Sequence, residues 1–222
     1  MNGPDRAMLY TLAIQTALRS SEIRSLTAGS LFLDSQCPYV VCKAGATKNR
    51  RPARQYIKPS LAAALREHLR TKAPQAPLFH MPPATDVAEM LRADLAATRS
   101  AWLTEAKHDP DEYRRRDQSD FLAAVNHEGE RLDFHSLRHT TGAWAAQGGA
   151  HPKAIQTLMR HSSITLTMDT YGHLFPGQEA ETVHRLPDMD TDDDALAATG
   201  TDDATANPAL NPQHIPQQSG CD

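Results

Sequence analysis

Short runs of apolar residues at helical spacing constrain the fold of this chain more than any other feature of its sequence. The run over residues 4–18 begins at Pro4, a residue that suits the first turn of a helix. The run that begins at Pro59 places Leu61, Leu65 and Leu69 at intervals of four, on one helix face. Further helices are predicted from Ser20 or Ser21, over residues 85–106 and 135–147, over residues 152–159, and from Ser162 or Ser163 through residue 171.

These helices also carry packing expectations. Arg19 would lie at a helix–helix junction, and the apolar stripe of residues 85–106, from Val87 to Leu103, would be buried. Trp144 would be available to the core, and the apolar residues between His161 and Tyr171 would serve for packing.

Three segments between the first helices favour strands. Residues 31–34, 39–43 and 54–58 are short, and the second is rich in β-branched side chains. A turn at residues 44–47 separates the last two, which places Lys48 at or near the tip of a hairpin. The predicted fold is therefore α+β, mostly helical with a small antiparallel sheet.

The charges are unevenly distributed along the chain. Residues 1–72 carry 12 basic and 4 acidic side chains, a net charge of +8, whereas residues 187–222 carry 8 acidic side chains and no basic one. The basic part is typical of a surface that binds a polyanion, although an uneven solvated surface is the alternative. The acidic part has little to bury. The sequence predicts one domain over residues 1–186 and a disordered tail over 187–222.

Composition excludes several classes of protein. No apolar run approaches the roughly 20 residues that a membrane span needs, and the start of the chain has no secretory pattern. The three cysteines lack the paired spacing of a zinc site. We therefore expect a cytoplasmic protein that does not enter a membrane.

The segment His135-Ser-Leu-Arg138-His139 is a candidate for chemistry. On a helix His135 and Arg138 share a face, and a guanidinium beside an imidazole suits an anion. A surface helix with scattered polar groups is the ordinary alternative. Metal binding by His135 and His139 is disfavoured, because Ser136 stands where a zinc protease needs Glu and no third ligand is evident.

A second candidate segment runs from His161 to Tyr171, ten residues later and close to three helical turns away. A single tyrosine near the end of a helix is ordinarily a packing residue. Alone, this segment does not indicate a function.

Taken together, these segments resemble the tyrosine recombinase (phage integrase) family over roughly residues 7–176. Thr16-Ala-Leu-Arg19-Ser-Ser-Glu22-Ile is similar to the family's first arginine motif, and Thr47-Lys48-Asn49 to its hairpin lysine. The His135 segment is similar to its central His-x-x-Arg box. Leu158-Met-Arg-His161-Ser-Ser-Ile and Asp169-Thr-Tyr171-Gly-His-Leu are similar to its last histidine and its nucleophile motif.

The resemblance implies the family's DNA breaking-rejoining fold and a site-specific recombinase or integrase that cuts and rejoins double-stranded DNA. Tyr171 would attack a scissile phosphate and form a 3′-phosphotyrosyl link. Arg19, Arg138 and His161 would stabilise the charged oxygens, Lys48 would protonate the leaving 5′-oxygen, and His135 would assist proton transfer. No cofactor and no metal are expected. Nearby phosphates would contact Lys43, Arg50, Arg51 and Arg54.

The chain also departs from the family pattern. Ala17 stands where a glycine is usual, and only 18 residues precede Arg19, so the N-terminal core-binding domain is expected to be absent. A separate protein could supply this clamp. The charged segment from about 100 to 130 exceeds what the catalytic fold needs, and its Arg114-Arg115-Arg116 run is a possible DNA contact.

Two alternatives to an active recombinase follow from the sequence. The first is a truncated, non-catalytic DNA-binding remnant or accessory factor, and the less favoured second is a type IB-like topoisomerase. An active recombinase of this type would be expected to act as a homotetramer on two duplexes, with residues 177–186 as a candidate docking helix, and to associate with the nucleoid.

Overall fold

The computed structural model describes residues 1–47, 50–175, 183–184 and 186 of the 222-residue chain. The chain divides into two units, Met1–Phe175 and Pro176–Asp222. Lys48 lies outside the described residues, as do most of the predicted docking helix at 177–186 and the whole predicted tail. The domain boundary expected after residue 186 stays a prediction. The elements below belong to the first unit.

Two helices at the N-terminus meet at the predicted junction. Helix α1 (Gly3–Thr16) begins where the Asn2 side chain accepts a hydrogen bond from the Asp5 backbone N–H at 2.8 Å. It ends at Ala17, whose φ of 53° is left-handed and turns the chain sharply. Helix α2 (Ser20–Arg24) follows, and Arg19 is its N-cap residue. The predicted helix–helix junction at Arg19 is confirmed.

The three predicted strands form a small antiparallel sheet. After the 3-10 turn η1 (Ala28–Ser30), strands β1 (Leu31–Phe32), β2 (Tyr39–Cys42) and β3 (Ala53–Tyr56) pair in the order β1-β2-β3. A second 3-10 turn, η2 (Ala44–Ala46), follows β2. The strands are shorter than predicted, because the chain bends after each two to four paired residues.

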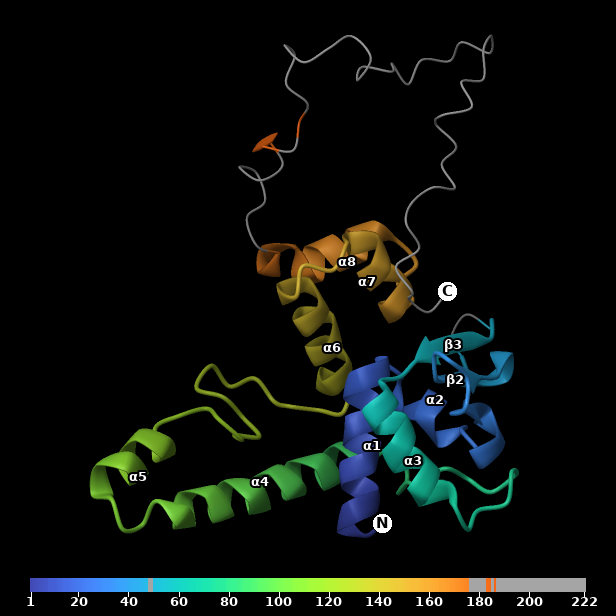
Figure 1. The fold of residues 1–222 in the computed structure, drawn as a ribbon. Helices are drawn as coiled ribbons and strands as arrows, with labels where there is room; N and C mark the ends of the chain where they lie inside the picture. The colour runs from blue at the N-terminus through green and yellow to red at the C-terminus, as the bar shows by residue number, and fades with distance from the viewer. Residues whose placement is uncertain (48–49, 176–182, 185, 187–222) are drawn as a thin grey trace, which may run out of the picture. The chain divides into compact units, whose positions relative to one another are not determined.

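Helix α3 (Pro59–Leu69) follows the sheet and buries Leu61 and Leu65, as its spacing predicts. Helix α4 (Val87–Glu105) then extends from the core, and α5 (Pro110–Asp117) lies beside its far end (Figure 1). We call α4 and α5 the arm.

The prediction that the apolar stripe of α4 is buried along its whole length is wrong. Val87 and Leu91 are buried at its start, whereas Trp102 is only partly covered. Trp102 packs against Phe121, with ring centroids 4.9 Å apart, and the Arg116 guanidinium lies 4.9 Å from the centre of its ring. The far half of α4 therefore has a small local cluster of its own outside the main core.

Three helices complete the unit. Helices α6 (Ser136–Gln147), α7 (Pro152–Met159) and α8 (Ile164–Tyr171) match the predicted segments, and the short turn η3 (Gly172–Leu174) follows. Helix α6 packs against α1, which brings the N-terminal helices to the C-terminal ones (Figure 1).

Two packing predictions for these helices are wrong. The sequence makes Trp144 available to the core, but it is 61% exposed on α6, because Thr141 and Gly142 occupy the face toward α1 and α8. The apolar residues between His161 and Tyr171 are predicted to pack inward. On α8 the inward positions are instead held by Thr167 and Tyr171, and the exposed ones are Ile164, Leu166 and Met168.

The buried residues form two clusters. The larger joins α1, α2, the sheet, α3 and the start of α4 around Leu12, Ile23, Val40 and Leu65. The smaller combines Ala17 with Ala146, Ile155, Met159 and Tyr171. Ala17 thus links the end of α1 to the helices that carry Tyr171. Within the described part of the chain, no helix is long and apolar enough to cross a membrane.

We expect Leu12→Ala to lower the free energy of unfolding by about 2–5 kcal/mol, because Leu12 is fully buried and its removal leaves a cavity. The matched change Leu103→Ala, at a partly exposed position on the arm, should cost only about 1 kcal/mol. Urea denaturation of both variants measures the difference. Equal losses would contradict this division between core and arm.

Candidate active site

The Arg19 side chain is held by a buried carboxylate. Glu22 is only 1% exposed, and its Oε2 accepts a hydrogen bond from the Arg19 backbone N–H at 2.7 Å. Its Oε1 lies 3.3 Å from Nη1 of the Arg19 guanidinium. The short helix α2 allows both contacts, because Arg19 is its N-cap residue and Glu22 is the third residue of the helix. Glu22 therefore orients Arg19 through both backbone and side chain.

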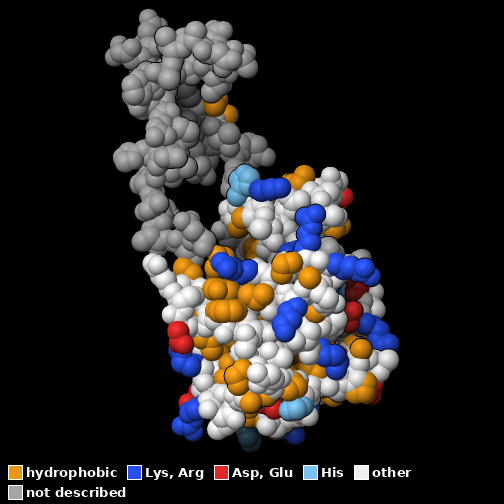
Figure 2. Space-filling view, turned by 90° about the vertical axis from the view of Figure 1, so that its right-hand side faces the viewer, with side chains coloured by type: hydrophobic (Ala, Val, Ile, Leu, Met, Phe, Trp, Pro, Cys, Tyr) orange, Lys and Arg blue, Asp and Glu red, His pale blue; other side chains and the backbone are white. Residues whose placement is uncertain are grey.

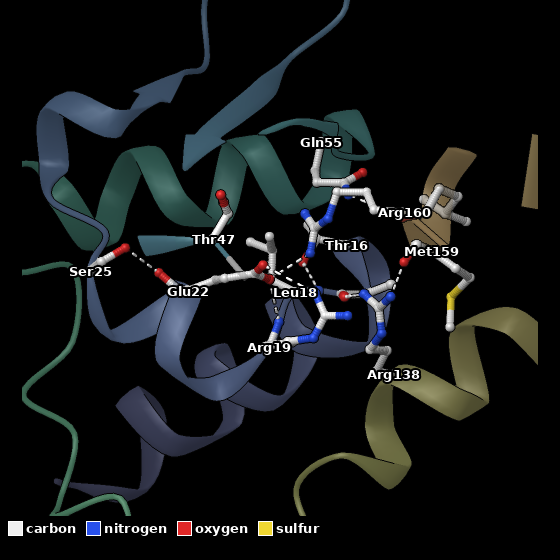
Figure 3. A network of polar contacts seen from close by, with 12 residues as sticks. Thr16, Leu18, Arg19, Glu22, Ser25, Thr47, Gln55, Arg138, Met159 and Arg160 are labelled. Atoms are coloured by element: carbon white, nitrogen blue, oxygen red, sulfur yellow. Dashed lines mark hydrogen bonds and ion pairs between the residues drawn. The ribbon is translucent and has the colours of Figure 1, made fainter. Parts of the chain in front are cut away.

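A second guanidinium, that of Arg138 on α6, is almost fully buried. Its Nη1 donates to the Ala17 carbonyl and its Nη2 to the Met159 carbonyl, as Figure 3 shows for Met159. Burial lowers the pKa of Arg138 to about 10, and the positive charges of Arg19 and Arg160 act in the same direction. Arg138 thus joins the segment before Arg19 to the segment before His161.

His161, another predicted site residue, follows Arg160, the residue that caps the end of α7. Its Nδ1 lies 2.9 Å from Oγ1 of the buried Thr167. When the Thr167 hydroxyl donates this hydrogen bond, the neutral imidazole carries its proton on Nε2 and can donate it to an anion. The pKa of His161 is lowered by burial and by the charges of Arg138 and Arg19. His161 therefore favours the neutral form beside two arginines.

Tyr171, the predicted nucleophile, packs inside the same group and is only 2% exposed. Its ring lies parallel to the His161 ring with centroids 6.4 Å apart, and its Oη is 3.1 Å from His139 Nδ1. Burial raises the pKa of the phenol, and the charge of Arg138 partly opposes this. The phenol is therefore neutral at neutral pH and needs a base before it can act as a nucleophile.

Gly142 makes room for the Tyr171 ring. A Cβ at this position on α6 would lie 2.3 Å from Cζ and 2.6 Å from Oη of Tyr171, far inside contact distance. Glycine in a helix interior costs about 0.5–1 kcal/mol relative to alanine. Here it is required by the close approach of the tyrosine.

His135 lies at the N-cap of α6, and its ring centroid is 5.0 Å from that of His139. Burial and the neighbouring His139 lower the pKa of His135. His135, Arg19, Ser20 and Ser21 line a small hollow of about 170 Å³. The hollow therefore lies between Arg19 and His135. Within the residues that the structure describes, no three His, Cys, Asp or Glu side chains form a group that could hold a metal.

The structure thus gathers Arg19, His135, Arg138, His161 and Tyr171, which lie as much as 152 residues apart in the chain. The sixth predicted residue, Lys48, lies outside the described residues. Its neighbours Thr47 and Arg50 are described, and the Thr47 hydroxyl is 2.7 Å from the Arg51 carbonyl, which closes the turn between β2 and β3.

The predicted DNA contacts are exposed on and around this hairpin. Lys43, Arg50, Arg51 and Arg54 all have exposed side chains, and the Arg54 guanidinium lies 4.2 Å from the centre of the Tyr39 ring. Figure 2 shows the side of the molecule that carries the sheet: Lys and Arg are spread over this face, and Asp and Glu lie mainly toward its edges.

The three consecutive arginines of the arm form ion pairs with neighbouring acids. Arg115 and Arg116 both pair with Glu112, at 2.6 Å and 2.7 Å, and Arg114 pairs with Asp111 at 3.3 Å. Exposed ion pairs such as those of Arg114 and Arg115 are weak, so a contact of this run with DNA stays a prediction.

Reasoning from the sequence missed two residues of the site. Arg160 reaches Glu22 from the side opposite Arg19, and Gly142 receives the Tyr171 ring. The only sequence signal for Arg160 was its place beside His161. Gly142 lies one helical turn after Arg138, where a small residue opposite a tyrosine could have been suspected.

The chain matches the phage integrase family over residues 2–177 and belongs to this family. It is 34% identical over 56 residues to a tyrosine recombinase XerC-like protein of Caldanaerobacter subterraneus subsp. tengcongensis, a match that covers 25% of this chain and 14% of that protein. The sequence-based identification of the family is confirmed.

Solved structures share the fold at low sequence identity. The Tn1549 transposon integrase, solved with circular intermediate DNA, is 17% identical with a TM-score of 0.53, covering 80% of this chain and 58% of that one. The XerH recombinase bound to its difH substrate is 16% identical with a TM-score of 0.54, covering 84% and 48%. The catalytic domain of bacteriophage HP1 integrase is 17% identical with a TM-score of 0.50, covering 85% of each chain. The predicted catalytic-domain fold is confirmed.

We expect Gly142→Ala to expel the Tyr171 phenol from its buried position, because the added methyl would overlap the ring. The pKa of Tyr171 should then fall toward its ordinary value, since burial is the main cause of its increase. Ultraviolet titration of each protein against its own Tyr171→Phe variant isolates this phenol from the other tyrosines. An unchanged titration in the Gly142→Ala protein would contradict the proposed packing.

The lowered pKa of His161 predicts a stability that falls in acid. The folded protein resists protonating this imidazole, whereas the unfolded chain takes up the proton near the ordinary pKa of about 6.5, so acid favours unfolding. We expect the midpoint of thermal unfolding to fall less between about pH 7.5 and 5.5 in His161→Gln than in the unmodified protein. The exposed His108→Gln is the control. Parallel pH profiles for all three proteins would refute this interpretation.

Proposed function

We propose that this chain is the catalytic domain of a site-specific recombinase that cleaves and rejoins DNA through a covalent link to Tyr171. The observation that carries the proposal is the convergence of Arg19, Arg138 and two histidines around one tyrosine, within a chain of the phage integrase family. The Tn1549 transposon integrase was solved with circular intermediate DNA and XerH with its difH substrate, which supports the choice of DNA as the substrate.

The two arginines supply the electrostatic stabilisation. Each guanidinium carries five N–H donors, and the described contacts of Arg138 use two of its nitrogens. The remaining donors of Arg138 and Arg19, with Nε2–H of His161, match the nonbridging oxygens of a phosphodiester. These oxygens gain negative charge as the phosphorus becomes five-coordinate, so fixed donors aimed at them lower the barrier.

The chemical step transfers one phosphate ester to the enzyme. Tyr171 Oη attacks the phosphorus and forms a P–O bond while the bond from phosphorus to the 5′-oxygen breaks. The phenol proton passes to a base. We assign this role to His135, one helical turn before His139, because the contact of His139 Nδ1 with Oη at 3.1 Å belongs to the resting arrangement. The product is a 3′-phosphotyrosyl link and a free 5′-hydroxyl, and the reverse step rejoins the strand.

The leaving 5′-oxygen needs a proton donor, and we assign this role to Lys48. The support is its position in the chain, between β2 and β3 and beside the exposed cations of the same hairpin. Lys43, Arg50, Arg51 and Arg54 are proposed to contact phosphates on either side of the scissile one. Such contacts position the duplex without reading its sequence.

The described arrangement is the resting one. Tyr171 and Arg138 are each 2% exposed, so a phosphate carried by a duplex cannot reach either side chain without a rearrangement at α8. Turning the phenol away from Gly142 breaks its hydrogen bond to His139 and its contact with the His161 ring, and it exposes a buried side chain; DNA contacts would have to offset this cost. A homotetramer on two duplexes, and a separate protein that completes the clamp, remain further proposals for the active state.

A covalent trap tests the proposal. The probe is a pool of random-sequence duplexes with a nick, so that cleavage releases a short 5′-hydroxyl fragment that diffuses away and prevents rejoining. We expect a protein–DNA species that survives denaturation with detergent. Sequencing the DNA in this species identifies the cleavage site. Tyr171→Phe should bind the same DNA with similar affinity and form no such species.

Three results would contradict the proposal. A Tyr171→Phe protein that forms the same adduct would show that another residue is the nucleophile. Salt-sensitive DNA binding with no adduct from any duplex would favour a non-catalytic DNA-binding role. Relaxation of a supercoiled plasmid of any sequence would favour a topoisomerase.

A further inference from the structure

The backbone of Arg160, next to the predicted catalytic residue His161, is strained. It caps α7 with a φ of 49°, in the left-handed region that residues with a Cβ rarely adopt. This turn ends α7 and sets the direction of the chain at His161. Because a glycine would relieve the strain, the presence of arginine here points to a use for its side chain.

That side chain forms an ion pair with the buried Glu22. Arg160 Nη2 lies 2.5 Å from Glu22 Oε2, and the two side chains are 14% and 1% exposed. Figure 3 shows Arg160 and Arg19 approaching Glu22 from different sides. Among the described residues, no acceptor meets Arg160 Nη1, although this nitrogen is buried. The left-handed backbone of Arg160 and its unpaired Nη1 are both unfavourable, and the ion pair with Glu22 is the contact that accompanies them.

The balance of charges explains the contact. Glu22 holds Arg19 in place, but a lone carboxylate would also cancel most of the positive charge that Arg19 offers to an anion. With Arg160 and Arg138 included, three guanidiniums face one carboxylate, and two positive charges are left over. A phosphodiester carries one negative charge and gains more as the phosphorus is attacked, so this excess matches the reaction.

We propose that Arg160 is a positioning residue that balances the charge of Glu22, so that Glu22 orients Arg19 without neutralising it. The inference rests on the proposed function of the site. Arg160 also follows Met159, whose carbonyl holds Arg138, so its ion pair fixes the distance between the two catalytic arginine segments. Arg160 is not expected to contact the DNA phosphate itself.

The test compares the single-turnover rate of covalent adduct formation on a nicked duplex that the unmodified protein cleaves. We expect Arg160→Met to lower this rate by about 10²-fold, while DNA affinity changes little. Without Arg160, the Glu22 carboxylate neutralises more of the Arg19 charge, and Arg19 is less well positioned. Arg160→Gly keeps the turn and relieves its strain, yet should lose the rate equally. Arg66→Met is the matched control, since Arg66 forms an exposed ion pair with Asp34 at 3.1 Å and lies outside the site.

Two further measurements separate positioning from simple structural support. Adding Glu22→Gln to Arg160→Met should recover part of the lost rate, because an uncharged amide no longer cancels the charge of Arg19. Millimolar guanidinium ion should also raise the rate of Arg160→Gly by refilling the empty space beside Glu22, whereas urea at the same concentration should not. Thermal unfolding of each variant, measured in the same buffer, sets a temperature at which all are folded.

The outcomes distinguish this inference from the function on which it rests. An unmodified protein that forms no adduct contradicts the proposed function, and with it the role of Arg160. Adduct formation at a normal rate by folded Arg160→Met or Arg160→Gly overturns the inference alone. A double variant whose losses simply multiply would also overturn it, because Arg160 would then act independently of Glu22.

Discussion

The buried Arg138 guanidinium is the contact on which the geometry of the site depends. It donates to the Ala17 carbonyl, two residues before Arg19, and to the Met159 carbonyl, two residues before His161. Removing a buried charge from water is expensive, and these hydrogen bonds compensate part of that cost only while both segments stay in place. A chain in which α1 and α7 moved apart would leave Arg138 unpaired, so the site and the packing of these helices are formed together.

A second buried charge, the Glu22 carboxylate, holds two arginines of the site in place. It lies between Arg19 and Arg160 and keeps two guanidiniums close that would otherwise repel each other. The surroundings are apolar, with Ile23 and Cys42 fully buried, and the nearby charge of Glu22 helps burial to raise the pKa of the Cys42 thiol to about 12. An anion that enters this site therefore meets oriented donors with little competing water.

The sequence predicted the order and approximate extent of the helices and strands, because prolines, serine caps and apolar spacing are local signals. It also identified five residues that the structure brings together. It could not predict that Trp144 is exposed, since that depends on which face of α6 meets α1 and α8. Nor could it predict the arm, because the pairing of Arg116 with Glu105 and Trp102 arises only once α5 folds back beside α4. Arg160 was missed because its partner lies 138 residues away.

Tyr171 is buried in this structure, whereas the proposed reaction needs its phenol at the DNA phosphate. The phenol is stored against Gly142, hydrogen-bonded to His139, and shielded from solvent. Under the proposed function, the phenol would leave this position only when DNA binds, and its release would require movement at α8. The same helix exposes Ile164, Leu166 and Met168, so its outer face is not held by the described core.

The most direct measurement of the central claim is a crystal structure of the chain with orthovanadate and the two DNA fragments that flank a cleaved bond, since five-coordinate vanadate mimics the phosphorus being attacked. The account predicts vanadate oxygens within hydrogen-bond distance of Arg19, Arg138 and His161, with Tyr171 Oη bonded to the vanadium and withdrawn from Gly142. Vanadate bound away from the two arginines, or an apical position filled by another side chain while Tyr171 stays buried, would contradict it.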